Sequence, residues 1–308
     1  NGADTGIILG GNDAAATIES VTVNSPVFAG LDIDGSIGGS SVDDLEVNGG
    51  DYGMYVSSFA RGKMDVTNFD FDAQDNAGIY YVTDMGGDHS GSITNSNGAA
   101  YKYGANTVED VTFDSITLSG NKIGIETAGS GDITIKDSTF TSVDEDIRIT
   151  GPSEVDFVEG TIDSTSVVVT GTGGFDRQRA LALTLDADSS PVEGATVLLM
   201  SGEDKVSGYA VTDASGIAQD LRFRTIRVDS SGLTTETLTG YEVTTVAEIE
   251  YSTTVADFRY AFDSVTLDDN PGNSAAVSLT NNVDTRFCSS STSTTNYDII
   301  RSCSGSHY

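Results

Sequence analysis

The chain has 308 residues, of which 47 are acidic and 15 basic, so its formal net charge at pH 7 is −32. A field of this sign repels phosphate and excludes general affinity for nucleic acid or for an anionic membrane. The sequence contains no signal peptide and no apolar run long enough for a membrane-spanning helix, so we expect no direct membrane insertion.

A glycine followed by an aliphatic residue recurs through the first half of the chain, as in Gly6-Ile7, Gly30-Leu31 and Gly53-Met54. A period of 20 to 25 residues means that each unit is a coil that buries its apolar face only by stacking on its neighbours. The sequence therefore predicts a solenoid over residues 1–172. Eight markers define about eight coils: Gly6, Gly30, Gly53, Gly78, Ala100, Gly124, Asp146 and Ser166.

Residues around each marker alternate with a period of two, which is typical of a strand with one buried face. The residue after each marker and the residue two positions further on are almost all apolar, and both are expected to point inward. The residue between them is expected to point outward, which gives the column Ile8, Asp32, Tyr55, Tyr80, Lys102, Glu126, Arg148 and Val168. A second apolar ladder precedes the markers: Val21/Val23, Leu45/Val47, Phe69/Phe71, Ile93, Ile116/Leu118, Phe140 and Ile162.

Short segments such as 132–140 and Val66-Thr67-Asn68-Phe69 resemble the degenerate coil motif of the right-handed parallel β-helix superfamily, which includes pectate lyases, polygalacturonases and phage tailspikes. This resemblance covers residues 1–172. It implies an all-β fold built on a right-handed parallel β-helix and implies no particular chemistry.

A different pattern begins near Gly174, with short alternating strands separated by polar turns, as expected for an immunoglobulin-like or transthyretin-like β-sandwich over residues 175–266. The segments 191–199 and 211–216 are similar to the carboxypeptidase regulatory-like modules of secreted and surface proteins. That resemblance implies a spacer or an adhesive stalk.

The tail at 267–308 is rich in serine and threonine and contains both cysteines, Cys288 and Cys303. Two cysteines in a polar tail, without metal-ligand spacing, predict a disulfide, and a disulfide implies an oxidising compartment. Two free buried thiols are the alternative.

The acidic composition also bears on the source of the protein. So much like charge opposes compaction at low salt, whereas the screening length falls from about 10 Å at 0.1 M salt to about 3 Å at 1 M. We therefore expect an extracellular or cell-surface protein from a high-salt or marine source, which includes archaea. An acidic secreted protein of ordinary origin is the alternative.

The solenoid starts abruptly, since residues 1–6 lead directly into a coil without a capping segment. Open solenoid ends expose strand edges that favour pairing with another chain. Either upstream sequence precedes this chain, or another subunit covers the end, which would give self-assembly into a filament or lattice.

Turns after the first strand of successive coils are expected to share one long face, which would gather Asp34, Arg61, Lys63, Asp84, Asp88 and His89. Carboxylates beside cations and an imidazole could divide proton abstraction and calcium binding, as in a polysaccharide lyase. No catalytic residue is assigned, because the polygalacturonase motifs are absent: His89 lies in Asp-His-Ser, and Arg148-Ile149 is followed by Thr150. No cofactor is expected. Calcium at Asp34, Asp84 and Asp88 is a weaker expectation, since the known calcium loops are absent.

The outward column provides a second candidate. Tyr55 and Tyr80 are expected to stack on neighbouring coils, and Lys102, Glu126 and Arg148 extend the same strip. Tyrosine offers apolar area with a polar tip, which suits surface glycans or a partner protein, although stacked aromatics also stabilise a sheet. The sequence as a whole favours a secreted structural or adhesive protein, with a polysaccharide lyase, hydrolase or glycan-binding module as the alternative.

Overall fold

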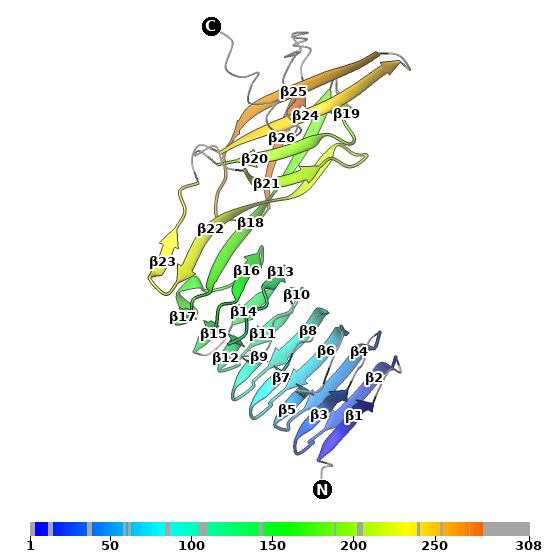
Figure 1. Cartoon of the computed structure of the whole chain (residues 1–308), viewed down its shortest axis with the longest axis vertical. Coiled ribbons are helices and arrows are strands. Elements are labelled where there is room, and N and C mark those ends of the chain that lie inside the picture. Colours follow the sequence, from blue (N-terminus) through cyan, green and yellow to red (C-terminus); the bar gives the residue numbers. More distant parts are fainter. Residues whose placement is uncertain are drawn as a thin grey trace.

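The computed structural model describes residues 4–11, 15–35, 39–57, 60, 63–83, 87–104, 110–141, 144–187, 189–201, 206–238, 241–252, 255–270 and 272–279. These residues form an all-β fold that begins with a parallel solenoid of about seven turns. The strands stack in chain order from the N-terminal end upward (Figure 1). The predicted all-β class and the predicted parallel solenoid are confirmed.

One face of the solenoid is an eight-stranded parallel sheet, called the first sheet. Its register is the one predicted from the repeat: Ile7 pairs with Leu31, Leu31 with Met54, and the outward residues pair in the same way. Each coil contributes one strand, in the order β1 (Thr5–Gly11), β3 (Ala29–Gly35), β5 (Tyr52–Val56), β7 (Ala77–Tyr81), β9 (Ala99–Tyr103), β12 (Ile123–Thr127), β15 (Glu145–Ile149) and β17 (Val167–Val169).

The rest of each coil belongs to the second sheet, in which strands also stack in parallel. A residue with positive φ bends most of these coils in mid-course: Ser20, Asp44, Asn68, Ser115, Asp137 and Glu159. The strands are β2 (Thr17–Asn24), β4 (Ser41–Asn48), β6 (Asp65–Asp72), β8 (Asp88–Thr94), β10 (Val111–Asp114), β11 (Thr117–Ser119), β13 (Ile133–Lys136), β14 (Thr139–Thr141) and β16 (Glu154–Val158).

The predicted inward columns line one continuous core that runs through the solenoid. Its largest fully buried side chains include Tyr81, Tyr101, Phe71 and Phe113. Buried amides close the turns between the two sheets: Asn121 Nδ2 donates to the Ile93 carbonyl at 2.8 Å, and its Oδ1 accepts from the Ser96 N–H at 2.9 Å. These contacts satisfy backbone groups that a buried turn would otherwise leave unpaired.

Acidic side chains on the outer surface pair with hydroxyl and amide groups one coil away. Asp72 accepts from Thr94 at 2.6 Å and from Asn95 at 2.8 Å. Asp43 accepts from Thr67 and Asn68, and these two hydrogen bonds hold its pKa below the usual range. The solenoid therefore accommodates many carboxylates with few basic partners.

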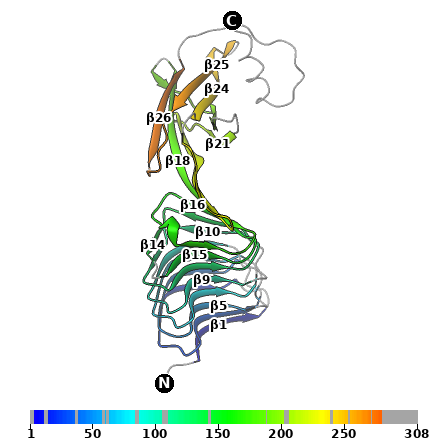
Figure 2. The ribbon, with the colours of Figure 1, turned by 90° about the vertical axis from the view of Figure 1, so that its left-hand side faces the viewer.

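The C-terminal half continues from the solenoid through one long strand, β18 (Gly174–Ala187). Its first residues pair in parallel with β16. The strand β22 (Ile217–Asp229) pairs antiparallel with β18 from Phe175 to Thr184, and β26 (Asn273–Leu279) pairs in parallel with its last seven residues. The strand starts within the predicted boundary at 172–175 and joins the solenoid to the C-terminal half without a linker. Asn273–Leu279, which the sequence pattern assigns to the tail, lie in this sheet. Figure 2 shows the narrow ribbon that results above the solenoid.

A separate four-stranded sheet faces this extension. It contains β21 (Val206–Val211), β20 (Thr196–Met200), β24 (Tyr241–Ser252) and β25 (Val255–Val265). A second hydrophobic cluster lies between the two sheets, with Leu183 and Phe223 from one and Val197 and Val243 from the other. The remaining elements are the short β19 (Ser190–Pro191), β23 (Gly232–Thr235), which pairs with β22, and one turn of 3₁₀ helix at Ser164–Ser166.

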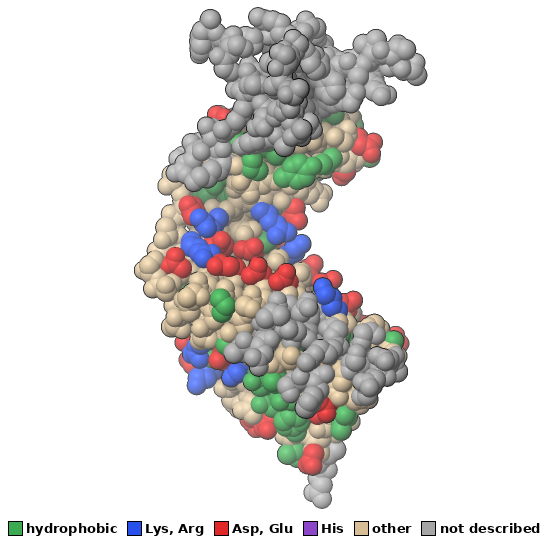
Figure 3. All heavy atoms as spheres, viewed as in Figure 1, with side chains coloured by type: hydrophobic (Ala, Val, Ile, Leu, Met, Phe, Trp, Pro, Cys, Tyr) green, Lys and Arg blue, Asp and Glu red, His purple; other side chains and the backbone are tan. Residues whose placement is uncertain are grey.

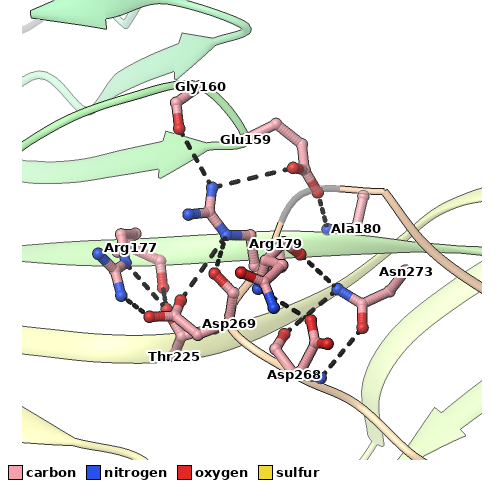
Figure 4. A network of polar contacts seen from close by, with 10 residues as sticks. Glu159, Gly160, Arg177, Arg179, Ala180, Thr225, Asp268, Asp269 and Asn273 are labelled. Atoms are coloured by element: carbon pink, nitrogen blue, oxygen red, sulfur yellow. Dashed lines mark hydrogen bonds and ion pairs between the residues drawn. The ribbon is translucent and has the colours of Figure 1, made fainter.

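The last coil is covered by β22, whose Ile226 and Val228 join the solenoid core. Beside them lies a network centred on the buried Arg179 of β18 (Figure 4). Its guanidinium lies 3.8 Å from Glu159 and 3.4 Å from the Gly160 carbonyl, both in the last solenoid turn, and it donates to the Asp269 carbonyl at 3.1 Å. Three segments remote in the sequence are joined where the solenoid meets the C-terminal half.

Candidate functional site

Four aromatic rings gather on the outer face of the first sheet, around the predicted column. Tyr55 and Tyr80 pair in register on β5 and β7, with ring centroids 5.7 Å apart. Tyr52 lies 5.1 Å from Tyr55, and Phe28 lies 4.9 Å from Tyr55. We call Phe28, Tyr52, Tyr55 and Tyr80 the aromatic strip. A hydrophobic patch is visible over β5 and β7 in Figure 3.

The aromatic strip lies in acidic surroundings. Burial raises the pKa of Tyr52 and Tyr55, and the charges of Asp51 near the first and of Asp32 near the second act in the same direction. Asp32 precedes Tyr55 in the column, and its Oδ1 is buried without a hydrogen-bond partner. Burial and the neighbouring Asp34 raise the pKa of Asp32. The strip therefore combines partly exposed aromatic rings with carboxylates that repel anionic ligands.

The column continues in charged residues, as predicted. Lys102 lies with its Nζ 5.7 Å from the centroid of the Tyr80 ring and 3.7 Å from Glu126 on the next coil. Arg148 makes a bidentate pair with Glu145, at 2.6 and 2.7 Å, and this pair raises the pKa of Arg148. Both cations are thus engaged by carboxylates, which leaves little net positive charge for an acidic glycan.

The predicted catalytic face does not assemble around an exposed imidazole. His89 lies inside the solenoid, 1% exposed, with its Nε2 2.9 Å from the Tyr81 hydroxyl and its ring packed against Phe113 and Tyr101. Burial lowers its pKa to about 3 against a small opposing effect of Asp65, so the ring is neutral at pH 7. The expectation of an exposed, titratable His89 is corrected, because strand alternation turns this residue toward the core.

The other members of that face are spread over different contacts. Arg61 and Asp84 lie outside the described residues. Lys63 is exposed, and Asp34 accepts from the Ser57 hydroxyl at 2.6 Å at the end of β3. Asp88 opens β8 in the second sheet, where its N–H donates to Asp65. Among the residues that the structure describes, no group of three or more Asp, Glu, His or Cys side chains is placed to hold a metal ion.

The alternating pattern of the sequence does not predict two members of the aromatic strip. Phe28 precedes β3, and Tyr52 pairs with Ala29 and Ala77 at positions that are buried in neighbouring coils. Neither fits the outward column, so the period of two does not reveal them. A usable signal is the clustering of four aromatic residues within coils two to four.

Cys288 and Cys303 lie outside the described residues, so the predicted disulfide stays a prediction. Over the described ranges, no helix has the length and hydropathy needed to span a membrane. Comparison of the chain with protein-family models, with curated proteins and with solved structures found no match in any of the three.

Proposed function

We propose that this chain is a structural and adhesive protein of the cell exterior, in which the solenoid presents the aromatic strip to surface glycans. The observation that carries the proposal is the packing of Phe28, Tyr52, Tyr55 and Tyr80 on an outer sheet face, with centroid distances between 4.9 and 5.8 Å. Large aromatic side chains on a rigid surface are typical anchors of binding sites.

The charge distribution around the aromatic strip limits the class of glycan that it can bind. Asp32, Asp34 and Asp51 flank the rings, and the net charge of −32 opposes the approach of uronates or sulfated chains. A neutral sugar ring can lie on the tyrosine faces and donate its hydroxyls to the flanking carboxylates. The strip is therefore proposed to bind neutral glycans.

The remainder of the proposal concerns setting and scaffold. The parallel solenoid supports a relation to the β-helix superfamily, and the paired sheets after β18 support a stalk of the carboxypeptidase regulatory-like type. The carboxylate ladders on the coil surface support a high-salt environment, in which their mutual repulsion is screened. A melting temperature that does not rise between about 0.1 M and about 2 M salt would argue against such a source.

Replacing Tyr55 and Tyr80 together with serine is expected to weaken the binding of neutral oligosaccharides by at least about tenfold, because each ring supplies stacking area that serine lacks. Glycan-array binding followed by calorimetry measures the change. Tyr209→Ser is the matched control, since Tyr209 is 60% exposed on β21 and lies outside the strip. Equal affinities for the double variant and the control would refute the role of the strip.

Self-association through the first coil is a second candidate, favoured by exposed apolar surface there. Ile8 is 65% exposed, Val27 is 59% exposed, and the inward residues Ile7 and Leu9 are only partly buried. A second copy that covered this surface would extend the stack through a heterologous contact that need not close.

Electron microscopy and light scattering test this second candidate at about 0.1 M and about 2 M salt, because screening of the −32 charge is required for close approach. We expect ordered filaments or sheets at high salt, and we expect Ile8→Lys to abolish them. Single rods under every condition would leave glycan adhesion as the proposed role.

A further inference from the structure

The fourth coil is one residue shorter than its neighbours at the bend of the second sheet. Val66 and Phe113 both pair with His89, and Phe71 and Leu118 both pair with Ile93. Five positions separate the paired residues in the flanking coils, but only four separate His89 from Ile93. The missing residue leaves an open hollow of about 760 Å³ among β6, β8, β10 and β11, which we call the notch.

Gly91 closes the shortened bend. Its φ is +151°, and a Cβ at this position would lie 2.4 Å from the Phe69 carbonyl oxygen. Only glycine therefore allows coil four to approach the backbone of coil three this closely at the bend.

The wall of the notch carries hydrogen-bonding groups of two kinds. Asp70 and Asp114 accept from Ser92 at 2.6 Å and from Ser115 at 2.8 Å, which orients their carboxylates. Asp88, Ser90 and Thr117 line the same hollow, and none of their side chains has a partner among the described residues. Carboxylates accept only, whereas hydroxyls both donate and accept, so the wall matches a ligand that does both.

The charge and the spacing of the carboxylates in the notch indicate which class of ligand it can bind. Within the described residues, no cluster of acidic side chains is placed to hold a metal ion. The three carboxylates of the notch, Asp70, Asp88 and Asp114, therefore do not converge on one point. They disfavour phosphates and uronates by repulsion. A hollow of about 760 Å³ is within the range of small-ligand sites. We propose that the notch binds a short neutral oligosaccharide, whose hydroxyls donate to the carboxylates and exchange hydrogen bonds with Ser90 and Thr117.

This site lies on the second sheet and does not depend on the role of the aromatic strip on the first. Two substitutions alter the notch and leave the aromatic strip unchanged. Ser90→Tyr fills the hollow, and Asp88→Asn removes a charged acceptor while keeping its shape. Asp144→Asn is the control, because Asp144 is an exposed carboxylate on the turn before β15 and lies outside the notch.

The test is calorimetric titration of the whole chain with a panel of neutral oligosaccharides built from glucose, galactose, mannose or xylose. In the Tyr55→Ser, Tyr80→Ser background, where the aromatic strip does not contribute, Ser90→Tyr and Asp88→Asn are each expected to weaken binding by about tenfold or more. Ser90→Tyr does so by filling the hollow, and Asp88→Asn by the loss of one charged hydrogen bond. The control and the Tyr55→Ser, Tyr80→Ser variant are expected to retain notch binding. Circular dichroism melting confirms that each variant is folded.

Three results would overturn the proposal. The first is that no member of the panel binds the wild-type chain at millimolar concentration. The second is that binding measured in the Tyr55→Ser, Tyr80→Ser background survives both notch substitutions, or that this background alone abolishes all binding, which would assign glycan binding to the strip. The third is notch-dependent binding of a tetralysine peptide without any glycan binding, which would assign the hollow to basic protein segments.

Discussion

Replacing Gly53 with valine is expected to lower the free energy of unfolding by about 3 kcal/mol or more, because the marker glycine has no room for a side chain. A Cβ on Gly53 would lie 2.6 Å from the Phe71 ring and 2.7 Å from the Gly78 carbonyl oxygen. The second atom is backbone of the next coil and cannot move without disturbing the first sheet. Chemical denaturation followed by circular dichroism measures the loss.

Gly10→Val is the matched control for this prediction. Gly10 also lies in a strand of the first sheet, but the nearest atom to its Cβ position is the Asp34 carbonyl oxygen at 3.7 Å. Valine favours extended backbone, so this substitution is expected to change stability by less than about 1 kcal/mol. Similar losses for the two variants would show that crowding at the marker is not the reason for the glycine repeat.

The same crowding explains why the solenoid could be predicted from the sequence. Gly30, Gly53 and Gly78 each face a bulky residue of the second apolar ladder, namely Val47, Phe71 and Ile93. The first four coils repeat this requirement, since a Cβ on Gly6 would likewise lie 2.5 Å from Val23. Ala100, Asp146 and Ser166 occupy the marker position in later coils, where the alternation alone continues the register. The pairing of Ile7 with Leu31, and of each later pair in the column, follows from that repetition.

His89 was misplaced for a related reason. Its distance from the preceding marker predicts an exposed turn, but it shares an inner column with Val66 and Phe113. His89 follows its marker Gly78 by 11 residues, whereas Val66 and Phe113 follow theirs by 13, so counting from the markers alone hides this alignment. Aligning the second ladder separately would have revealed both the buried imidazole and the notch.

The C-terminal half depends on contacts that a local pattern does not contain. The alternation at 180–185 predicts a strand, but it does not indicate that the same strand starts on the last solenoid coil. The parallel pairing of Asn273–Leu279 with β18 joins segments about 90 residues apart. At the junction Asp269 pairs with Arg177, and Glu159 and Asp269 pair with Arg179, which are contacts between segments that no local pattern links.

The buried His89 is expected to make the wild-type chain lose stability as the pH falls below about 6.5. The unfolded chain takes up a proton on this imidazole near pH 6.5, whereas burial lowers the pKa of the folded chain to about 3. The unfolded state therefore binds more protons throughout this window, and stability is lost as the pH falls through it. Each pH unit is expected to cost about 1.4 kcal/mol.

Comparison with His89→Gln isolates the effect, since both proteins contain the same carboxylates and the same Tyr81 hydroxyl. Between pH 6.5 and pH 4 the wild-type chain is expected to lose about 3 kcal/mol more than the variant in urea denaturation. Nuclear magnetic resonance of the imidazole provides a second readout, because a core histidine that keeps its partner at 2.9 Å should stay neutral at pH 4. Parallel pH profiles for the two proteins, together with an imidazole that titrates near pH 6.5, would mean that His89 is reached by solvent and that a surface role for it must be reconsidered.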